Sequence, residues 1–463
     1  MTPKRKLKQN IENPKRLFYN KPKTYFVRSI MKVSFYTLGC KVNQYESRSL
    51  SELLNKFGYE TVGKDESADV YIINSCTVTA ESDRKTRQAV RRFKRNNPNA
   101  VVVLTGCMPQ AYPKDAEALV QADIVIGNKS NGELPEILEE FFRNRKRTVL
   151  TSQHEKGEAF SSCSVSSFDE RTRAYVKIQD GCNRFCSYCI IPVARGRVRS
   201  KPLGALKTEL EKLSAAGYKE IVLVGINLSA YGQDLDEKFC DAVELACSVE
   251  GIERVRLGSL EPDHLTSEVI ERLSKCKKLC PQFHISLQSG CDNTLRRMNR
   301  HYTADEYRSL CRSLRSCFDD CTLTTDVMVG FCGESDEDFE ESLRFVKEIG
   351  FEKVHVFPYS VRVGTKAEKM DGHLPKSVKE KRAAIMSEEC EKMRESFLRS
   401  QIGRTVNVLF ESKEKDGMIL GHTANYTPVK AKGGHELFGK FANVKITGVE
   451  DRILIGKIVD LAD

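Results

Sequence analysis

Between residues 175 and 357 the chain repeats one pattern six times, a short apolar run followed by a charged amphipathic stretch. The apolar runs predict strands at 175–178, 221–224, 254–257, 283–287, 322–329 and 354–357. Strands that alternate with helices pair in parallel, so six such units predict a partial (β/α)6 barrel. The active site of a barrel of this kind lies where the carboxyl ends of the strands meet their loops.

The loop after the first of these strands holds three cysteines, Cys182, Cys186 and Cys189, at C-x3-C-x2-C spacing. Cysteine thiolates are the usual ligands of iron–sulfur clusters. Three thiolates hold three irons of a 4Fe-4S cluster and leave the fourth iron open to another molecule. We therefore predict that these cysteines form a reactive, catalytic cluster and not a structural metal clip.

A second α/β region lies before the barrel, from Met31 to about residue 148. Its predicted strands, at 32–38, 70–73, 100–104 and 124–126, alternate with amphipathic segments. This alternation is typical of a doubly wound parallel α/β domain, so the overall fold class is α/β.

Three cysteines of this region, Cys40, Cys76 and Cys107, each follow one of its first three strands. The carboxyl ends of parallel strands emerge at one edge of a sheet, so these residues can converge there. Their small neighbours Gly39, Ser75 and Gly106 leave room for a bulky group near the backbone. A second cluster is the favoured interpretation, and three buried core cysteines are the alternative.

The two ends of the chain differ from these regions. Residues 1–30 hold nine lysines and arginines and one carboxylate, and so carry eight of the ten net positive charges. We expect a disordered extension, with an RNA-binding arm or a start of translation at Met31 as alternatives. From residue 400 to 463, short β-branched runs broken by Gly and Asp predict a small β-barrel of about five strands.

These patterns divide the chain into a basic extension (1–30), an α/β domain (31–150), a Ser-rich linker (151–170), the partial barrel (171–399) and the small β-barrel (400–463). The sequence has no apolar run long enough for a membrane span and no apolar core of a signal peptide, so we expect a cytoplasmic protein. In that compartment the 17 cysteines are expected as reduced thiols or metal ligands.

The Cys182 loop after a barrel strand resembles that of the radical S-adenosylmethionine (SAM) enzymes. With Cys40, Cys76, Cys107 and the terminal barrel, which resembles the TRAM module, the chain after about Met31 is similar to the methylthiotransferase family. Several strings resemble the MtaB type of that family, among them TLGCKVNQ at 37–44, CTVT at 76–79, GINL at 225–228, HISLQSGC at 284–291 and GHTANY at 421–426.

The resemblance implies two 4Fe-4S clusters and SAM as cofactors. The cluster of Cys182, Cys186 and Cys189 would bind SAM and yield a 5′-deoxyadenosyl radical, and the auxiliary cluster of the first triad would carry the sulfur. The implied reaction is methylthiolation at C2 of N6-threonylcarbamoyladenosine beside the tRNA anticodon, at position 37. The implied partners are the tRNA anticodon loop, a reductant protein such as flavodoxin or ferredoxin, and a sulfur source.

Three alternatives stay open at this point. The first is a methylthiotransferase for isopentenyl-adenosine in tRNA. The second is a single-cluster radical SAM enzyme that modifies RNA. The third is an iron–sulfur RNA-binding sensor without enzymatic activity.

Candidate SAM-binding residues lie at the predicted strand ends, where polar groups can hold the amino-acid and ribose parts of the cofactor: Gly225, Asn227, Ser286, Gln288, Asp326 and Glu334. Each of them can instead cap a helix or satisfy a turn. Candidate RNA-binding residues are Arg195, Arg197 and Arg199 after the cysteine loop and His422, Asn425 and Tyr426 in the small barrel. The arginines can instead form a solvated surface, and Tyr426 a part of the core. Cys332 stands where the family usually has proline, and we do not interpret it as a metal ligand.

Overall fold

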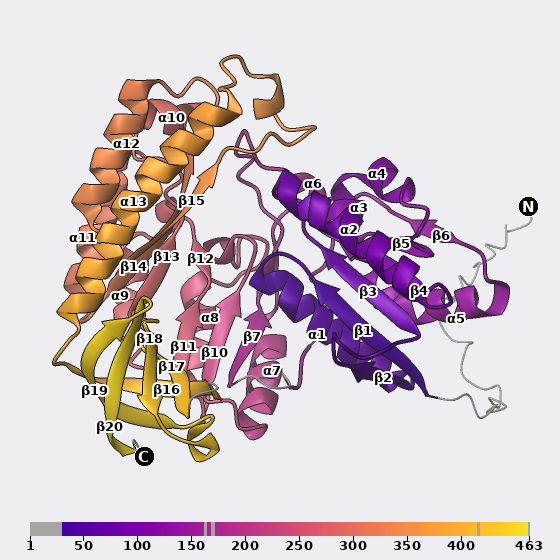
Figure 1. Cartoon of the computed structure of the whole chain (residues 1–463), viewed down its shortest axis with the longest axis horizontal. Helices are drawn as coiled ribbons and strands as arrows, with labels where there is room; N and C mark the ends of the chain where they lie inside the picture. Colours follow the sequence, from indigo (N-terminus) through magenta and orange to yellow (C-terminus); the bar gives the residue numbers. More distant parts are fainter. Residues whose placement is uncertain (1–29, 162–163, 168–171, 414–416, 462–463) are drawn as a thin grey trace, which may run out of the picture.

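The computed structural model describes residues 30–161, 164–167, 172–413 and 417–461. Figure 1 shows an N-terminal α/β part, a central half-open barrel and a small yellow β-barrel beneath it. The expectations for residues 1–29, and for 162–163 and 168–170 of the linker, lie outside the described residues. No helix in the described part of the chain is both long and apolar enough to cross a membrane.

The N-terminal part is a parallel six-stranded sheet in the order β2-β1-β3-β4-β5-β6. The strands are β1 (Met31–Thr37), β2 (Tyr59–Val62), β3 (Val70–Ser75), β4 (Val101–Gly106), β5 (Ile124–Ile126) and β6 (Thr148–Leu150). Helices α1 (Lys41–Lys56) and α5 (Leu134–Asn144) cover one face. Helices α2 (Ala80–Asn96), α3 (Cys107–Ala111) and α4 (Pro113–Glu117) cover the other. The predicted doubly wound domain is confirmed, and β2 and β6 are edge strands too short and too polar for the sequence to reveal.

This strand order has a topological switch point between β1 and β3, because the chain leaves β1 toward β2 on one side and continues at β3 on the other. Ligands of open α/β sheets bind at the carboxyl ends of the strands that flank such a point. Cys40 follows β1 and Cys76 follows β3, so both lie at this position.

The central part has the six predicted parallel strands, in two sheets ordered β11-β10-β7 and β12-β13-β14-β15. They are β7 (Arg173–Lys177), β10 (Glu220–Val224), β11 (Arg254–Leu257), β13 (Gln282–Ile285), β14 (Thr322–Val329) and β15 (Lys353–Pro358), with the two-residue β12 (Ser259–Leu260) added. A parallel bridge between Val255 and Leu279 connects the two sheets. The sheet therefore curves into the predicted partial barrel.

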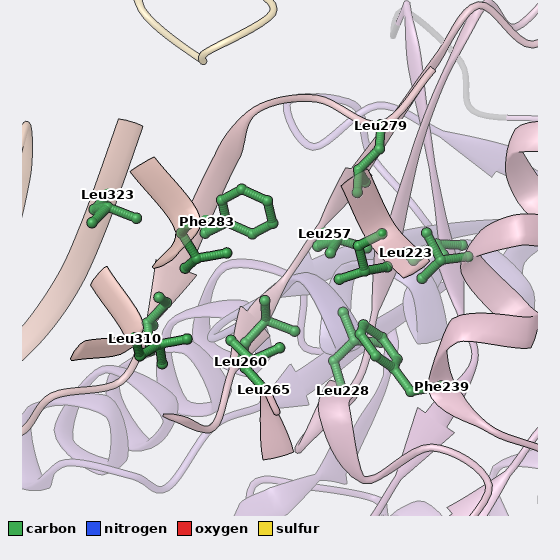
Figure 2. Close-up of a cluster of buried hydrophobic side chains, with 14 of the residues drawn as sticks. Leu223, Leu228, Phe239, Leu257, Leu260, Leu265, Leu279, Phe283, Leu310 and Leu323 are labelled. Atoms are coloured by element: carbon green, nitrogen blue, oxygen red, sulfur yellow. The ribbon is translucent and has the colours of Figure 1, made fainter. Parts of the chain in front are cut away.

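Helices cover the outside of this barrel: α7 (Leu203–Ala215), α8 (Phe239–Ser248), α9 (Ser267–Ser274), α10 (Asp292–Arg297), α11 (Ala304–Cys317), α12 (Asp336–Ile349) and α13 (Lys376–Ser400). The short helix α6 (Ile191–Arg195) instead packs against α3 of the N-terminal part. Figure 2 shows the core between strands and helices, where Leu223 and Leu257 approach Leu228 and Phe239. These side chains are almost completely buried. Their packing holds the strand ends, and the loops that follow them, in a fixed arrangement.

The C-terminal part is a closed barrel in the order β16-β17-β18-β20-β19. Its strands are β16 (Thr405–Lys413), β17 (Met418–Thr423), β18 (Pro428–Lys432), β19 (Phe441–Glu450) and β20 (Ile453–Leu461). The expectation of a small five-stranded barrel is confirmed. The loop after β17 docks on the central barrel, since Arg256 donates to the Ala424 carbonyl at 2.8 Å and Thr322 donates to the Asn425 carbonyl at 2.8 Å.

Candidate functional site

The first cysteine triad gathers at the switch point of the N-terminal sheet. Cys40 caps α1 and is exposed, whereas Cys76 and Cys107 are buried. Burial is the main cause that raises the pKa of the Cys107 thiol to about 12, and the charges of Cys76 and Cys40 act on it in the same direction. Because β1, β3 and β4 are neighbouring parallel strands, the three cysteines that follow them lie at one edge of the sheet, although they stand far apart in the sequence.

Asn43 and Gly39 shape this triad. The Asn43 side-chain amide donates to the carbonyls of Leu38 at 2.8 Å and Ser75 at 3.0 Å, which joins the ends of β1 and β3. Gly39 has φ +103°, and a Cβ placed there would lie 2.7 Å from the Cys76 Cβ. Only glycine fits this turn without displacing a triad cysteine.

The second triad lies in the loop between β8 (Gln179–Asp180) and α6. Cys182, Cys186 and Cys189 are all half-buried, and the Cys189 N–H donates to the Cys186 carbonyl at 3.0 Å. The Arg184 N–H donates to the Cys182 sulfur at 3.4 Å. Burial, reinforced by the other two thiols of the loop, raises the pKa of Cys189.

Each triad receives one hydrogen bond from a buried arginine. Arg195 Nε donates to Cys107 Sγ at 3.3 Å, and Arg300 Nη1 donates to Cys186 Sγ at 3.2 Å. Hydrogen bonds to cluster sulfurs and nearby charge tune the reduction potential of such clusters. The sequence analysis missed Arg300, whose only signal is its position shortly after the arginines that end α10.

The two triads meet at one interface, because α6, which begins two residues after Cys189, packs against α3, which begins at Cys107. No three His, Cys, Asp or Glu side chains within the described ranges gather tightly enough to hold a single metal ion. A four-iron cluster is wider than an ion, so its thiolates stand further apart. Three soft thiolates with N–H donors directed at their sulfurs are a donor set that fits a 4Fe-4S cluster at either triad.

Five of the candidate SAM residues lie in three places. Asn227 reaches the second triad, since its amide donates to the Cys182 sulfur at 3.6 Å. Ser286 and Gln288 lie at the carboxyl end of β13, where the Ser286 carbonyl accepts from the Tyr302 hydroxyl at 2.8 Å and Gln288 has φ +67°. Gly225 and Asp326 line the large cavity described below.

Glu334 does not belong to this set. Its side chain is buried beside α13, where it accepts from the Gly330 N–H at 2.6 Å and from Arg382 Nη1 at 2.6 Å. The carboxylate that was predicted to hold SAM therefore joins a loop to α13. Cys332 is buried next to it, with its sulfur 3.4 Å from His373 Nδ1 and far from either triad in the chain.

The candidate RNA-binding arginines differ in their exposure to solvent. Arg195 and Arg199, predicted to contact RNA, are buried. The Arg195 guanidinium is bonded to Glu46 and Asn43, and that of Arg199 lies 3.5 Å from Asp180. Arg197 is exposed, with its guanidinium 4.4 Å from the centre of the Phe185 ring.

The small-barrel candidates face the central barrel. Asn425, predicted to contact RNA, is buried, and its side-chain amide donates to Asp320 at 3.0 Å. The rings of His422 and Tyr426 stack at 4.7 Å between centroids and line the large cavity. They can meet only a molecule that enters that cavity.

This cavity, of about 880 Å³, lies inside the partial barrel. The turn Gly39–Val42 of the N-terminal part forms one wall, the inner faces of β13, β14 and β15 form another, and the loop after β17 closes the base. Its lining mixes apolar and charged side chains, and His284 Nε2 lies 3.3 Å from the Asp326 carboxylate. Cys40 opens into the same space, so the first triad borders a chamber large enough for a modified nucleoside.

Family models match the three parts of the chain. They are the uncharacterised protein family UPF0004 over residues 32–127, the radical SAM superfamily over 176–346 and the TRAM domain over 399–459. Among solved structures, the fold is similar to that of the radical SAM methyltransferase TsrM from Kitasatospora setae, with a TM-score of 0.53 and 15% identity over 71% of this chain and 75% of that one.

Curated relatives are similar along nearly their whole length. Threonylcarbamoyladenosine tRNA methylthiotransferase MtaB of Bacillus subtilis is 38% identical over 89% of this chain and 93% of that protein, and the protein of the same name from Aquifex aeolicus is 39% identical over 90% and 100%. A tRNA-2-methylthio-N(6)-dimethylallyladenosine synthase of Clostridium botulinum is 36% identical over 91% and 95%. The chain therefore belongs to the radical SAM methylthiotransferase family, whose members are transferases that use S-adenosylmethionine and an iron–sulfur cluster.

Proposed function

We propose that this protein methylthiolates C2 of N6-threonylcarbamoyladenosine at position 37 of tRNA. The observation that carries the proposal is the convergence of two cysteine triads on one interface, with Cys40 of the first triad open to a chamber inside the barrel. A C2–H bond of adenine is not acidic, so acid–base catalysis by side chains offers little for this reaction. Hydrogen-atom abstraction by a carbon radical meets that need, and cofactors supply such a radical.

We propose that Cys40, Cys76 and Cys107 hold an auxiliary 4Fe-4S cluster and that Cys182, Cys186 and Cys189 hold the SAM-binding one. When bound, the second of these supplies the electron for reductive cleavage of SAM, and the first supplies the sulfur. Arg195 and Arg300 would each donate a hydrogen bond to the sulfur of one cysteine ligand, and Asn227 would orient Cys182. Gly225, Ser286, Gln288 and Asp326 remain the candidates for SAM at the strand ends.

The choice of nucleoside rests on two kinds of support. The Bacillus subtilis and Aquifex aeolicus relatives are named for threonylcarbamoyladenosine, and the Clostridium botulinum relative is named for dimethylallyladenosine. The chamber is lined by charged and polar side chains, such as Lys41, His284 and Asp326. Such charged and polar groups can pair with the hydroxyl and carboxylate of a threonyl group, whereas a dimethylallyl chain offers them no partner.

We propose that the tRNA anticodon loop approaches past the exposed Arg197 and that the base enters the chamber against His422 and Tyr426. A reductant protein and a sulfur source complete the set of partners. The domain limits that we propose for these functions are 31–150, 171–399 and 400–463.

Mass spectrometry of tRNA nucleosides tests the function. Cells that lack the gene should lose 2-methylthio-N6-threonylcarbamoyladenosine and accumulate its precursor, and the gene should restore it. Loss of the dimethylallyl (isopentenyl) methylthio species instead would assign the chain to the other branch. Unchanged levels of both would refute the proposal.

A further inference from the structure

Three cations that line the chamber, Lys41, Lys353 and Arg394, have no carboxylate at ion-pair distance among the described residues. Of these, Lys41 follows Cys40 directly. Its ammonium group lies 5.9 Å from the centroid of the Tyr426 ring. A partly buried ammonium group without an acceptor costs free energy, and a ligand that accepts a hydrogen bond from it removes that cost.

The carboxylates near Lys41 are already paired. Glu220 lies 3.0 Å from Arg256 and 3.7 Å from both Arg173 and Arg254, and Glu411 lies 2.7 Å from Arg173. Three arginines and Lys41 thus share two carboxylates at the base of the chamber. This surplus of positive charge favours an anionic group of the ligand.

The remaining acidic groups of the chamber do not compensate Lys41. Asp326 lies 3.3 Å from His284 on the opposite wall, and Glu391 lies 3.1 Å from Arg452. Glu352 accepts from the Leu323 N–H at the amino end of β14. None of these three chamber carboxylates pairs with Lys41, which lines the same chamber, among the described residues.

We propose that Lys41 binds the carboxylate of the threonyl group and so selects the threonylcarbamoyl base. This inference rests on the proposed function and deepens it. The threonyl group carries one free carboxylate, whereas a dimethylallyl group carries no charge. Because Lys41 adjoins Cys40, the same contact would place the base beside the first triad.

Binding of anticodon stem-loop RNA to the reconstituted, anaerobic holoenzyme tests this inference. Three RNAs are compared: one with threonylcarbamoyladenosine, one with the same base carrying a carboxamide in place of the carboxylate, and one with unmodified adenosine. Wild-type protein should bind the acid roughly 10- to 100-fold more tightly than the carboxamide, as expected for a charge-assisted contact. Lys41→Met should remove this preference, and Lys41→Arg should keep most of it.

Lys56→Met is the matched control, because Lys56 is an exposed lysine in the last turn of the same helix. It should retain the wild-type preference for the acid. Iron content and thermal unfolding of each variant show whether it is folded and loaded. If Lys41→Met disrupts folding, two measurements still test the inference. The first is the affinity of wild-type protein for the acid RNA and the carboxamide RNA, and the second is the same comparison with Lys41→Arg, which keeps the positive charge.

Three results would overturn the inference. An equal loss of affinity for all three RNAs in Lys41→Met would assign Lys41 to a backbone phosphate. A loss of SAM cleavage without RNA would assign it to the SAM carboxylate. If Lys41→Met keeps the preference for the acid RNA, Lys41 does not bind the threonyl carboxylate. The proposed function would still hold in that case, provided that wild-type protein methylthiolates the threonylcarbamoyl RNA. If wild-type protein leaves that RNA unmodified, the proposed function itself fails.

Discussion

Arg195 Nε lies 3.3 Å from Cys107 Sγ, and this hydrogen bond crosses from the central barrel to the N-terminal sheet. The same guanidinium is bonded to Glu46 of α1, and Lys177 at the end of β7 bonds to Glu46 at 2.7 Å. All of these groups are buried. One arginine thus links the domain interface, the first triad and the loop of the second triad.

Arg195→Met should destabilise the protein and change the auxiliary cluster. Removing one partner of a buried ion pair leaves Glu46 poorly compensated, which costs about 3 kcal/mol in the free energy of unfolding. Loss of a positive charge and of a hydrogen bond to sulfur should make the reduction potential of the auxiliary cluster more negative. Chemical denaturation and redox titration followed by electron paramagnetic resonance measure the two effects. Arg197→Met, at an exposed position, should change the unfolding free energy by less than about 1 kcal/mol. Equal effects of both variants would contradict the role of Arg195.

Alanine variants of the two triads should separate their functions. The reconstituted wild-type chain should bind about eight irons, as two 4Fe-4S clusters, and the Cys40/Cys76/Cys107 triple alanine variant about four. That variant should still cleave SAM but form no methylthio product. The Cys182/Cys186/Cys189 triple variant should retain about four irons and lose SAM cleavage. About four irons in wild-type protein would favour a single-cluster enzyme instead.

Gly39→Ala should weaken the first triad selectively. The residue has φ +103°, and its new methyl group would overlap Cys76. We expect the iron content to fall toward about four per chain while SAM cleavage persists. Gly217→Ala is the control, since Gly217 has φ +90° in a turn outside both triads with no atom near the added methyl group. A wild-type iron content in Gly39→Ala would show that the turn tolerates a side chain.

Arg197→Met should weaken tRNA binding without a preference for any base. A lost phosphate contact lowers affinity at every sequence and reduces the salt dependence of binding, d log K/d log[salt], by about 1. Fluorescence anisotropy at several salt concentrations measures both quantities. Lys207→Met, an exposed lysine on α7, provides a comparison at equal net charge. An unchanged salt dependence in Arg197→Met would place the RNA elsewhere on the protein.

The sequence alone determined the order of the strands and helices. It also identified the two cysteine triads as candidate sites for iron–sulfur clusters. Periodicity of apolar residues reports burial directly, so β1, β3, β4 and the six barrel strands were predicted close to their observed bounds. The parallel pairing that follows from such alternation also placed Cys40, Cys76 and Cys107 at one edge. Short polar strands such as β2, β6 and β18 carry too few apolar residues for the same signal.

Tertiary structure decided which charged residues face a ligand and which face each other. Arg195, Arg197 and Arg199 look alike in the sequence, but buried carboxylates engage the first and third and leave only Arg197 exposed. Glu334 likewise meets Arg382, which lies on a distant helix. Lys41 is the converse case, a cation for which the fold provides no carboxylate among the described residues. Charge pairing depends on distances of a few ångströms between elements far apart in the chain, and a linear sequence does not contain those distances.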